Sequence, residues 1–375
     1  MSFSVFPQEI TDYVLDFLHD NPKALRACAK TCRSWLPTSY LHLFANITFQ
    51  SPASCSAFGT LLQDAPYLGQ LVHDITFPML FDTKHHDQQL GSAVVDVPIP
   101  TTAYAALSAL KRLNLMMWNF DIYRYEGFAS LHSVTHLNLH FCRFPSFHSF
   151  AVFIMSFPNL EDLNIRDVTW EIDSEPAMPL PSLDPSISRL RKLATGIVTS
   201  LPQFVAWLRA SGLQCQISCV SVRCSSEDEA TALRVLSSSI GDALQNLEVD
   251  WLLRKPISSP ENYDVNARQS IKSLTLRFPI YNYQPLSWPT ALLSSVVTSS
   301  ELELLNLEIR LLGDLDCVEW RALRRILNSS SARSLKQVGM KVLVWPTARL
   351  PCQDIESFIR NYLPEISARG LLRFE

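Results

Sequence analysis

A short apolar spacing of the form L-x-x-L-x-L recurs along most of this 375-residue chain. Nine copies run from Leu110 to Leu335, so eight intervals cover 225 residues and average about 28 residues each. Alternating apolar positions over so few residues predict a short strand with one buried side. A fixed period of roughly 20–50 residues predicts stacked units, each burying its apolar side against its neighbours. A stacked array of this length can form one body, so length alone does not set the number of domains.

The copies are spread evenly over the chain. They begin at Leu110, Val134, Leu160, Leu190, Ile217, Leu244, Ile271, Leu302 and Leu335. Two weaker copies, one ending at Phe77 and one at Phe49, extend the pattern toward the N-terminus. Apolar residues at helical spacing fill many of the gaps between copies. The predicted helices cover residues 147–157, 201–212, 227–240, 289–299, 317–329 and 351–363.

One strand and one helix in each period resemble a leucine-rich repeat. The usual asparagine of that repeat is mostly missing, so the chain is similar to the irregular kind of leucine-rich repeat. The resemblance implies an α/β fold in which a repeat solenoid presents a curved parallel sheet. The alternative is an ordinary α/β domain with parallel strands.

The two-residue period of a strand predicts which side chains are exposed. The fourth and sixth positions of each copy point into the core, and the third, fifth and seventh line a concave sheet surface. Ten of the exposed positions are candidate target-binding residues: Arg112, His136, Asn138, His140, Asp162, Arg166, Arg223, Asp250, Arg277 and Glu308. Further positions on the same surface are Asn114, Met116, Asn164, Lys192, Cys219, Ser221, Asn246, Glu248, Ser273, Thr275, Asn306 and Lys341.

The chemistry of this surface favours one class of ligand over another. Both signs of charge and several amides suit a protein or peptide, whereas a polyanion requires one dominant sign. The exposed sheet of a solenoid must be polar in any case, which is the alternative explanation.

Residues 3–49 form a head that differs from the periodic body. Apolar residues on one stripe predict a first helix, with Pro7 at its first position. Asn21 and Pro22 begin a second helix, which Pro37 is expected to close. Two or three helices in fewer than 50 residues bury little surface alone, so their apolar faces need a partner or a neighbouring domain.

Three segments of the head resemble an F-box, particularly that of fungal proteins. They are Phe6-Pro7-Gln8-Glu9-Ile10, Val14-Leu15-Asp16-Phe17-Leu18, and residues 28–35, which contain Cys32-Arg33-Ser34-Trp35. Phe6 replaces the usual leucine, and Lys30-Thr31 stand where apolar residues are common. The resemblance implies adaptor-binding roles for Phe6, Pro7, Glu9, Ile10, Val14, Leu18, Leu25, Cys32 and Trp35.

The resemblance also implies a domain division and a function. Residues 1–49 would be the F-box, which binds a Skp-type adaptor and through it a cullin. Residues 50–375 would hold a target protein for an SCF-type cullin–RING ubiquitin ligase. The competing interpretation is a protein-interaction scaffold without a ubiquitin role, in which the head only caps the solenoid. An exposed apolar patch on the head would favour docking, because a cap covers such a patch.

Composition excludes several classes of protein. The net charge of −4 and the pI near 6.2 do not suit a generally basic nucleic-acid-binding protein. A hydrophobic content of 47% argues against disorder. No apolar run reaches the 18 residues or so of a membrane span, and the start lacks a secretory signal. Nine thinly spread cysteines indicate reduced thiols, and therefore cytosol or nucleus.

Catalytic motifs are absent from the sequence, so no enzyme activity, cofactor or metal is expected. Ten glycines form neither a phosphate-binding loop nor a nucleophile elbow. His136 and His140 lie on a predicted strand, too far apart to share zinc unaided, and Cys215, Cys219 and Cys224 lack zinc-ribbon spacing. The acidic residues 227–229 open a predicted helix, where the helix dipole explains them. His85 and His86 lie in a polar loop at residues 82–89.

Four tryptophans each follow a predicted strand by a few residues. They are Trp118, Trp170, Trp251 and Trp345. Each is either an aromatic anchor for a ligand or a plug at the rim of the core.

Overall fold

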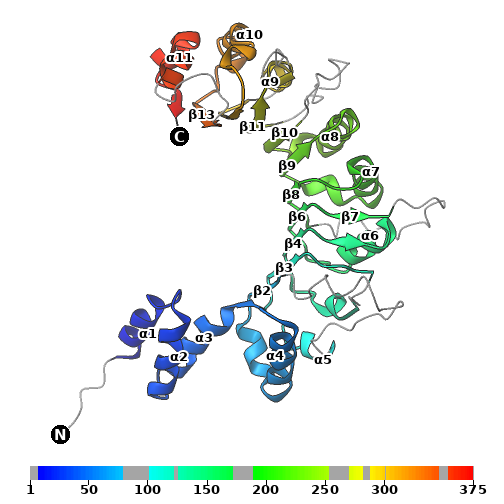
Figure 1. Ribbon diagram of the computed structural model, residues 1–375, viewed down its shortest axis with the longest axis vertical. Helices are drawn as coiled ribbons and strands as arrows, with labels where there is room; N and C mark the ends of the chain where they lie inside the picture. Colours follow the sequence, from blue (N-terminus) through cyan, green and yellow to red (C-terminus); the bar gives the residue numbers. More distant parts are fainter. Residues whose placement is uncertain are drawn as a thin grey trace. The chain divides into compact units, whose positions relative to one another are not determined.

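The computed structural model describes residues 7–78, 101–121, 126–171, 189–252, 270–281, 288–299, 301–345 and 354–374. Phe6 and the loop at residues 82–89 lie outside these ranges. The chain divides into two compact units, coloured along the sequence in Figure 1. Unit 1 comprises Met1–Leu160 and Asp167–Leu180, and unit 2 comprises Glu161–Arg166 and Pro181–Glu375.

Unit 1 contains the helical head and the first strands of the sheet. Its helices are α1 (Gln8–Asp16), α2 (Pro22–Thr31), α3 (Leu36–Ala45), α4 (Pro52–Asp64), α5 (Thr101–Tyr104) and α6 (Phe147–Met155). Its strands are β1 (Asn46–Thr48), β2 (Asp74–Phe77), β3 (Arg112–Met116), β4 (His136–His140), β5 (Arg143–Phe144) and β7 (Thr169–Trp170). Two 3-10 helices, η1 (Pro66–Leu71) and η3 (Glu126–Ser130), complete the first repeats.

Unit 2 continues the alternation of strand and helix. Its strands are β6 (Asp162–Arg166), β8 (Lys192–Thr195), β9 (Cys219–Cys224), β10 (Asn246–Trp251), β11 (Ser273–Ile280), β12 (Leu304–Leu311), β13 (Gln337–Val344) and β14 (Leu372–Phe374). Its helices are α7 (Leu201–Ser211), α8 (Glu227–Ile240), α9 (Trp288–Ser299), α10 (Trp320–Leu327), α11 (Ile355–Tyr362) and α12 (Pro364–Ala368).

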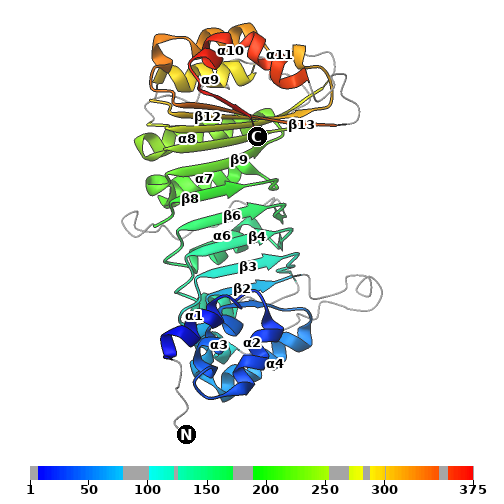
Figure 2. The ribbon, with the colours of Figure 1, turned by 90° about the vertical axis from the view of Figure 1, so that its left-hand side faces the viewer.

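The predicted α/β repeat architecture is confirmed. Twelve strands form one sheet in the order β1-β2-β3-β4-β6-β8-β9-β10-β11-β12-β13-β14, and every pair whose register is described is parallel. Figure 2 shows β2, β3 and β4 side by side in unit 1, and β8 beside β9 in unit 2. Each leucine-type copy supplies one strand, including the two weak copies, which form β1 and β2.

The core follows the alternation that the sequence predicts. Leu113 pairs in register with Leu137, and Leu247 with Val220, all with almost no exposed surface. Equivalent positions therefore stack from strand to strand, so each repeat buries its apolar side chains against its neighbours. No helix within the described ranges is long and apolar enough to cross a membrane.

Serine residues begin many of the covering helices. The Oγ atoms of Ser146 and Ser200 accept hydrogen bonds from backbone N–H groups at the starts of α6 and α7. Ser226 and Glu229 form a reciprocal capping box at the start of α8. This explains the predicted acidic cluster at residues 227–229 as helix-terminal chemistry.

Two expectations for the head were wrong in detail. Pro7 is the N-cap of α1 and not its first residue. Pro37 lies in the first turn of α3, while α2 ends at Thr31 and Cys32 is extended. The first turn of a helix tolerates proline, because N–H groups there have no partner within the helix.

The four tryptophans divide into two groups. Trp118, Trp170 and Trp251 are buried and pack in the core, while Trp345 is 53% exposed. Trp251 stacks on Trp288 with ring centroids 4.6 Å apart. The first three therefore close the rim of the core, and only Trp345 is presented to solvent as an anchor could be.

Candidate functional site

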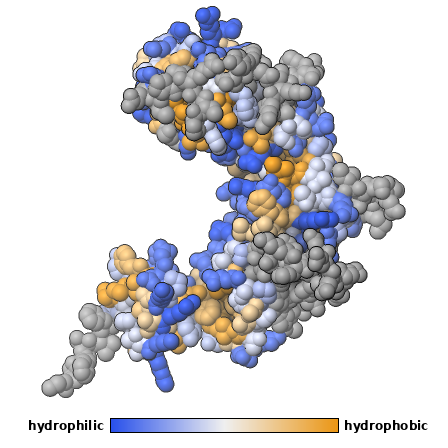
Figure 3. Space-filling view, in the orientation of Figure 1, coloured by the Kyte–Doolittle hydropathy of each residue, from blue (hydrophilic) through white to orange (hydrophobic). Residues whose placement is uncertain are grey.

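The first surface with functional features is the α1 helix of the head. Ile10, Tyr13, Val14 and Phe17 lie on one stripe and are 50–69% exposed, whereas Leu15 on the other side is buried. Figure 3 shows apolar side chains gathered on the head around α1. The apolar stripe of this helix therefore faces solvent and not its own domain.

Polar side chains of α1 bind α3 and the segment before it, on the side of the buried Leu15, although Gln8 and Asp16 are themselves exposed. His42 Nε2 lies 2.7 Å from Asp16 Oδ1, Thr38 donates a hydrogen bond to Asp12, and Gln8 donates to the carbonyl of Ser34 at 3.0 Å. These contacts orient the helix with its apolar stripe outward. An arrangement of this kind leaves a ready hydrophobic contact surface.

The remaining candidate adaptor-binding residues have mixed environments. Leu25 is buried between the helices, Leu18 and Trp35 are half-buried, and Pro7, Glu9 and Cys32 are exposed. Leu25 thus shapes the helical unit, while the exposed residues are available to a partner.

The thiol of Cys32 differs from the buried thiols of the chain. A hydrogen bond between Cys32 Sγ and Ser34 Oγ, at 3.1 Å, lowers the pKa of the Cys32 thiol. Burial raises the pKa of Cys55 and of Cys142 to about 12. At a given pH, the fraction of reactive thiolate is therefore larger at Cys32.

We expect iodoacetamide at a pH of about 8 to alkylate Cys32 well before Cys55 or Cys142, because thiolate is the reacting species. Mass spectrometry of peptides over time measures the three rates. Ser34→Ala should slow labelling at Cys32 and leave the exposed Cys215 unchanged. Equal rates at Cys32 and Cys142 would contradict the difference in environment.

The second surface is the outward face of the sheet, defined as the strand side chains that point away from the covering helices. In unit 1 this face is neutral and rich in amides. Arg112 Nη1 pairs with Asp74 Oδ2 at 2.9 Å, and Asn138 donates to Asn114 at 2.6 Å. Asn114 donates in turn to Thr76 at 2.9 Å, so side chains on three strands form one ladder.

The histidines of β4 lie on the same face. His136 and His140 are half-buried, and His136 Nδ1 lies 2.8 Å from the hydroxyl of Thr135. No group of three or more potential metal ligands occurs among the residues that the structure describes. Cys215, Cys219 and Cys224 are free thiols in three different environments, namely exposed, half-buried and buried.

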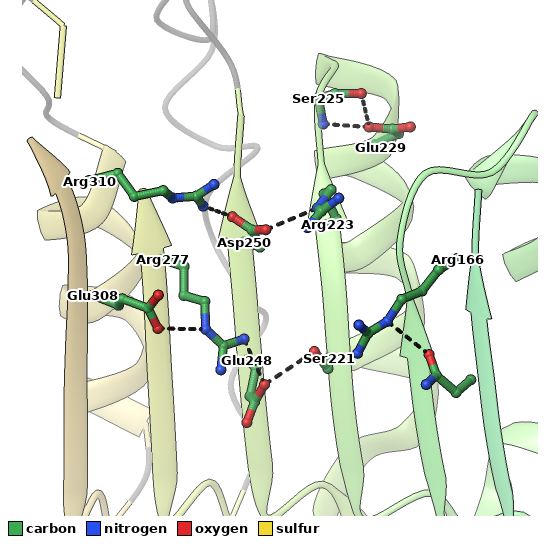
Figure 4. A network of polar contacts seen from close by, with 11 residues as sticks. Arg166, Ser221, Arg223, Ser225, Glu229, Glu248, Asp250, Arg277, Glu308 and Arg310 are labelled. Carbon is green, nitrogen blue, oxygen red and sulfur yellow. Dashed lines mark hydrogen bonds and ion pairs between the residues drawn. The ribbon is translucent and has the colours of Figure 1, made fainter. Parts of the chain in front are cut away.

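In unit 2 the outward face holds two chains of charged contacts, drawn in Figure 4. In the first chain, Asp250 accepts from Arg223 Nε at 2.9 Å and also from Arg310, which lies two strands away. The carboxylate of Asp250 is therefore shared by two guanidinium groups. Its side chain is only 13% exposed.

The second chain runs from Glu308 on β12 through Arg277 on β11 to Glu248 on β10. Arg277 donates to Glu308 at 3.0 Å and to Glu248 at 2.9 Å, and Ser221 also donates to Glu248 at 3.2 Å. Burial acts to lower the pKa of Arg277, but its hydrogen bonds to Glu248 and Glu308 outweigh this and raise that pKa. The predicted target-binding residues Arg223, Asp250, Arg277 and Glu308 are thus largely bound to one another or to their neighbours.

Two other predicted residues are placed differently. Arg166 donates to Asn164 at 3.2 Å, and its side chain runs close to Gly196, where an added Cβ would lie 3.1 Å from Arg166 Cα. Asp162 lies beside Lys192 in register without a close ion pair in the described ranges.

The sequence interpretation missed part of this face. Strands β11, β12 and β13 have eight residues each, so they add outward positions beyond the predicted ones, among them Arg310 and Leu343. The signal was present, because apolar residues continue to alternate at Ile309 and Leu311 after Glu308.

Comparisons with known proteins show likeness of fold only. No known sequence family and no curated protein matches the chain. An internalin from Listeria monocytogenes is similar over 88% of this chain and 95% of its own, with 11% identity and a TM-score of 0.36. A TLR13–ssRNA13 complex is similar over 75% of this chain and 43% of its own, with 12% identity and a TM-score of 0.32. A D-isomer-specific 2-hydroxyacid dehydrogenase from Lactobacillus delbrueckii matches at a TM-score of 0.21 and 10% identity.

Proposed function

We propose that the chain is the substrate-recognition subunit of an SCF-type cullin–RING ubiquitin ligase. Residues 1–49 are its F-box, which binds a Skp-type adaptor, and residues 50–375 bind a target protein through the outward face. The chain then acts by positioning. It holds the target near an enzyme that carries ubiquitin, which raises the effective concentration of the target's lysines there, and this chain itself makes or breaks no bond.

The observation that carries the proposal is the orientation of α1. Ile10 and Val14 match the F-box motif and are half-exposed on a helix that is held against α3 by the buried Leu15 and by polar contacts such as that of Asp16 with His42. A head that only capped the repeats would cover this stripe, since exposed apolar patches cost free energy unless a partner covers them. The exposed stripe therefore favours docking over the scaffold interpretation.

Ile10→Asp with Val14→Asp is expected to abolish capture of a Skp-type adaptor by the full chain. Burying a carboxylate in an apolar interface costs at least as much as losing a hot-spot residue, about 2 kcal/mol or roughly 30-fold in affinity. Quantitative pull-down with purified adaptor measures the change. Both positions are exposed, so the fold should be retained, and circular dichroism verifies it.

Tyr67→Asp provides the matched control, because Tyr67, like Ile10 and Val14, is an exposed large hydrophobic residue of unit 1 but lies outside the head. Adaptor binding should be unchanged in this variant. Adaptor binding that survives in the Ile10/Val14 variant, or no binding by the folded wild-type chain, would overturn the F-box role and leave the scaffold interpretation.

A further inference from the structure

The outward face of unit 2 differs in charge from the rest of the chain. Its strands present seven cations and four carboxylates, an excess of three positive charges on a chain whose net charge is −4. The cations are Arg166, Lys192, Arg223, Arg277, Arg310, Lys341 and Arg373, and the carboxylates are Asp162, Glu248, Asp250 and Glu308. A surface with this excess attracts acidic ligands.

The cations of this face fall into two groups. Arg223, Arg277 and Arg310 occupy the middle and are bound to Glu248, Asp250 and Glu308. The other four are exposed and form no ion pair with any residue in the described ranges. Their charges are therefore available to a ligand, whereas those of the central arginines are already neutralised.

The four unpaired cations lie at opposite ends of the face. Arg166 and Lys192 are on the neighbouring strands β6 and β8, and Lys341 and Arg373 are on the neighbouring strands β13 and β14. Five strand spacings of about 4.8 Å separate β8 from β13, or about 24 Å in total. An extended peptide that rises about 3.3 Å per residue covers this distance in about seven residues.

The second end also has an apolar component. Leu343 and Trp345 follow Lys341 on the same side of the chain and are 40% and 53% exposed. Leu343 lies beside Arg310 in register. An apolar ligand residue could therefore contact Trp345 while a neighbouring carboxylate binds Lys341.

We propose that this face binds an extended acidic segment of the target protein, with two acidic clusters about seven residues apart and an apolar residue next to one of them. The proposal rests on the target-binding role proposed above and specifies the target's chemistry. The central ion pairs would lie beneath the peptide and carry no net charge. A nucleic acid suits the face less well, because its evenly spaced phosphates would lie over Glu248, Asp250 and Glu308.

The probe is a synthetic fluorescent peptide with two Glu-Glu pairs separated by five Ser or Gly residues and followed by Leu. Fluorescence anisotropy with the full chain measures its affinity. Peptides with Gln in place of Glu, or with the four Glu contiguous, should bind at least about tenfold more weakly, since they lose the charge contacts at both ends or at one end of the face. Raising the salt from about 50 to about 200 mM should weaken binding of the original peptide.

Two double variants should each lower the affinity for the peptide at least about tenfold. They are Lys341→Glu with Arg373→Glu, and Arg166→Glu with Lys192→Glu. None of these side chains has an ion pair to lose within the described ranges, so the variants should fold, and thermal unfolding verifies this. Arg321→Glu with Arg325→Glu on α10 is the matched control, because it changes the net charge equally but away from the outward face.

Equal binding of the Glu and Gln peptides, or equal loss in the control and the two test variants, would overturn the proposal. Tighter binding of a single-stranded RNA of about 20 nucleotides, lost in the same variants, would also overturn it in favour of a polyanion site. Adaptor binding should be unchanged in every variant of the face. Failure of the peptide experiment is therefore distinct from failure of the F-box role.

Discussion

Replacing Phe153 by alanine is expected to lower the free energy of unfolding by about 3–5 kcal/mol. Phe153 on α6 has no exposed surface. Its ring centroid lies 4.9 Å from that of Phe120, 5.8 Å from that of Phe144 and 5.2 Å from that of Phe157. The substitution removes these contacts and leaves a cavity. Phe120 and Phe144 are already stacked on each other at 4.0 Å, so they can move little to fill it.

Urea unfolding of the full chain, followed by circular dichroism, measures this loss as a shift of the midpoint. Phe141→Ala is the matched control, since Phe141 is the exposed aromatic after β4 and should change stability by no more than about 0.5 kcal/mol. Similar losses in the two variants would show that the aromatic cluster does not stabilise unit 1.

The sequence predicts the repeats well because their signal is local. Each strand needs a few alternating apolar residues, and these recur in register from Ile75 to Met340. Helix α8 matches its predicted bounds, because Ser226 and Glu229 fix its start by chemistry within four residues. Proline occurs both after the end of a helix and in its first turn. At Pro37 the sequence predicts the end of the second helix, whereas the structure places this residue in the first turn of α3.

The direction of the α1 stripe is not a local property. The stripe itself follows from helical spacing, but its exposure depends on contacts from Asp12 and Asp16 to Thr38 and His42, which lie 26 residues away. A helix with apolar residues on one side is normally expected to bury that side. The exposure of this stripe becomes evident only from the structure.

The pairing of charges on the outward face is likewise beyond the sequence. Alternation predicts that Arg223, Asp250 and Arg277 share a face, and they do. Arg310 reaches Asp250 across an intervening strand and 60 residues of chain. Separating paired from unpaired charges therefore requires the register of four strands, together with the additional length of β12.

Asp250 is the carboxylate on which this network depends most. Asp250→Ala would leave Arg223 and Arg310 without their shared acceptor, and Arg277 lies opposite the same position on β11. The Nε of Arg310 is already buried without a hydrogen-bond partner among the residues that the structure describes. Removing one member of a buried ion pair costs about 3–5 kcal/mol, and partial exposure of the arginines reduces the expected loss to about 2–3 kcal/mol.

A double-mutant cycle separates the pair from other effects of the substitution. Arg310→Met retains the aliphatic stem but removes the charge, so in that background Asp250→Ala should cost about 1–2 kcal/mol less than in the wild type. The urea midpoints of the four proteins give the coupling free energy between Asp250 and Arg310. Asp242→Ala, at an exposed carboxylate without an ion pair in the described ranges, should change stability by no more than about 0.5 kcal/mol. Strictly additive effects would mean that Arg310 and Asp250 do not interact. The central charges of the outward face would then not be paired in the way that the acidic-peptide proposal assumes.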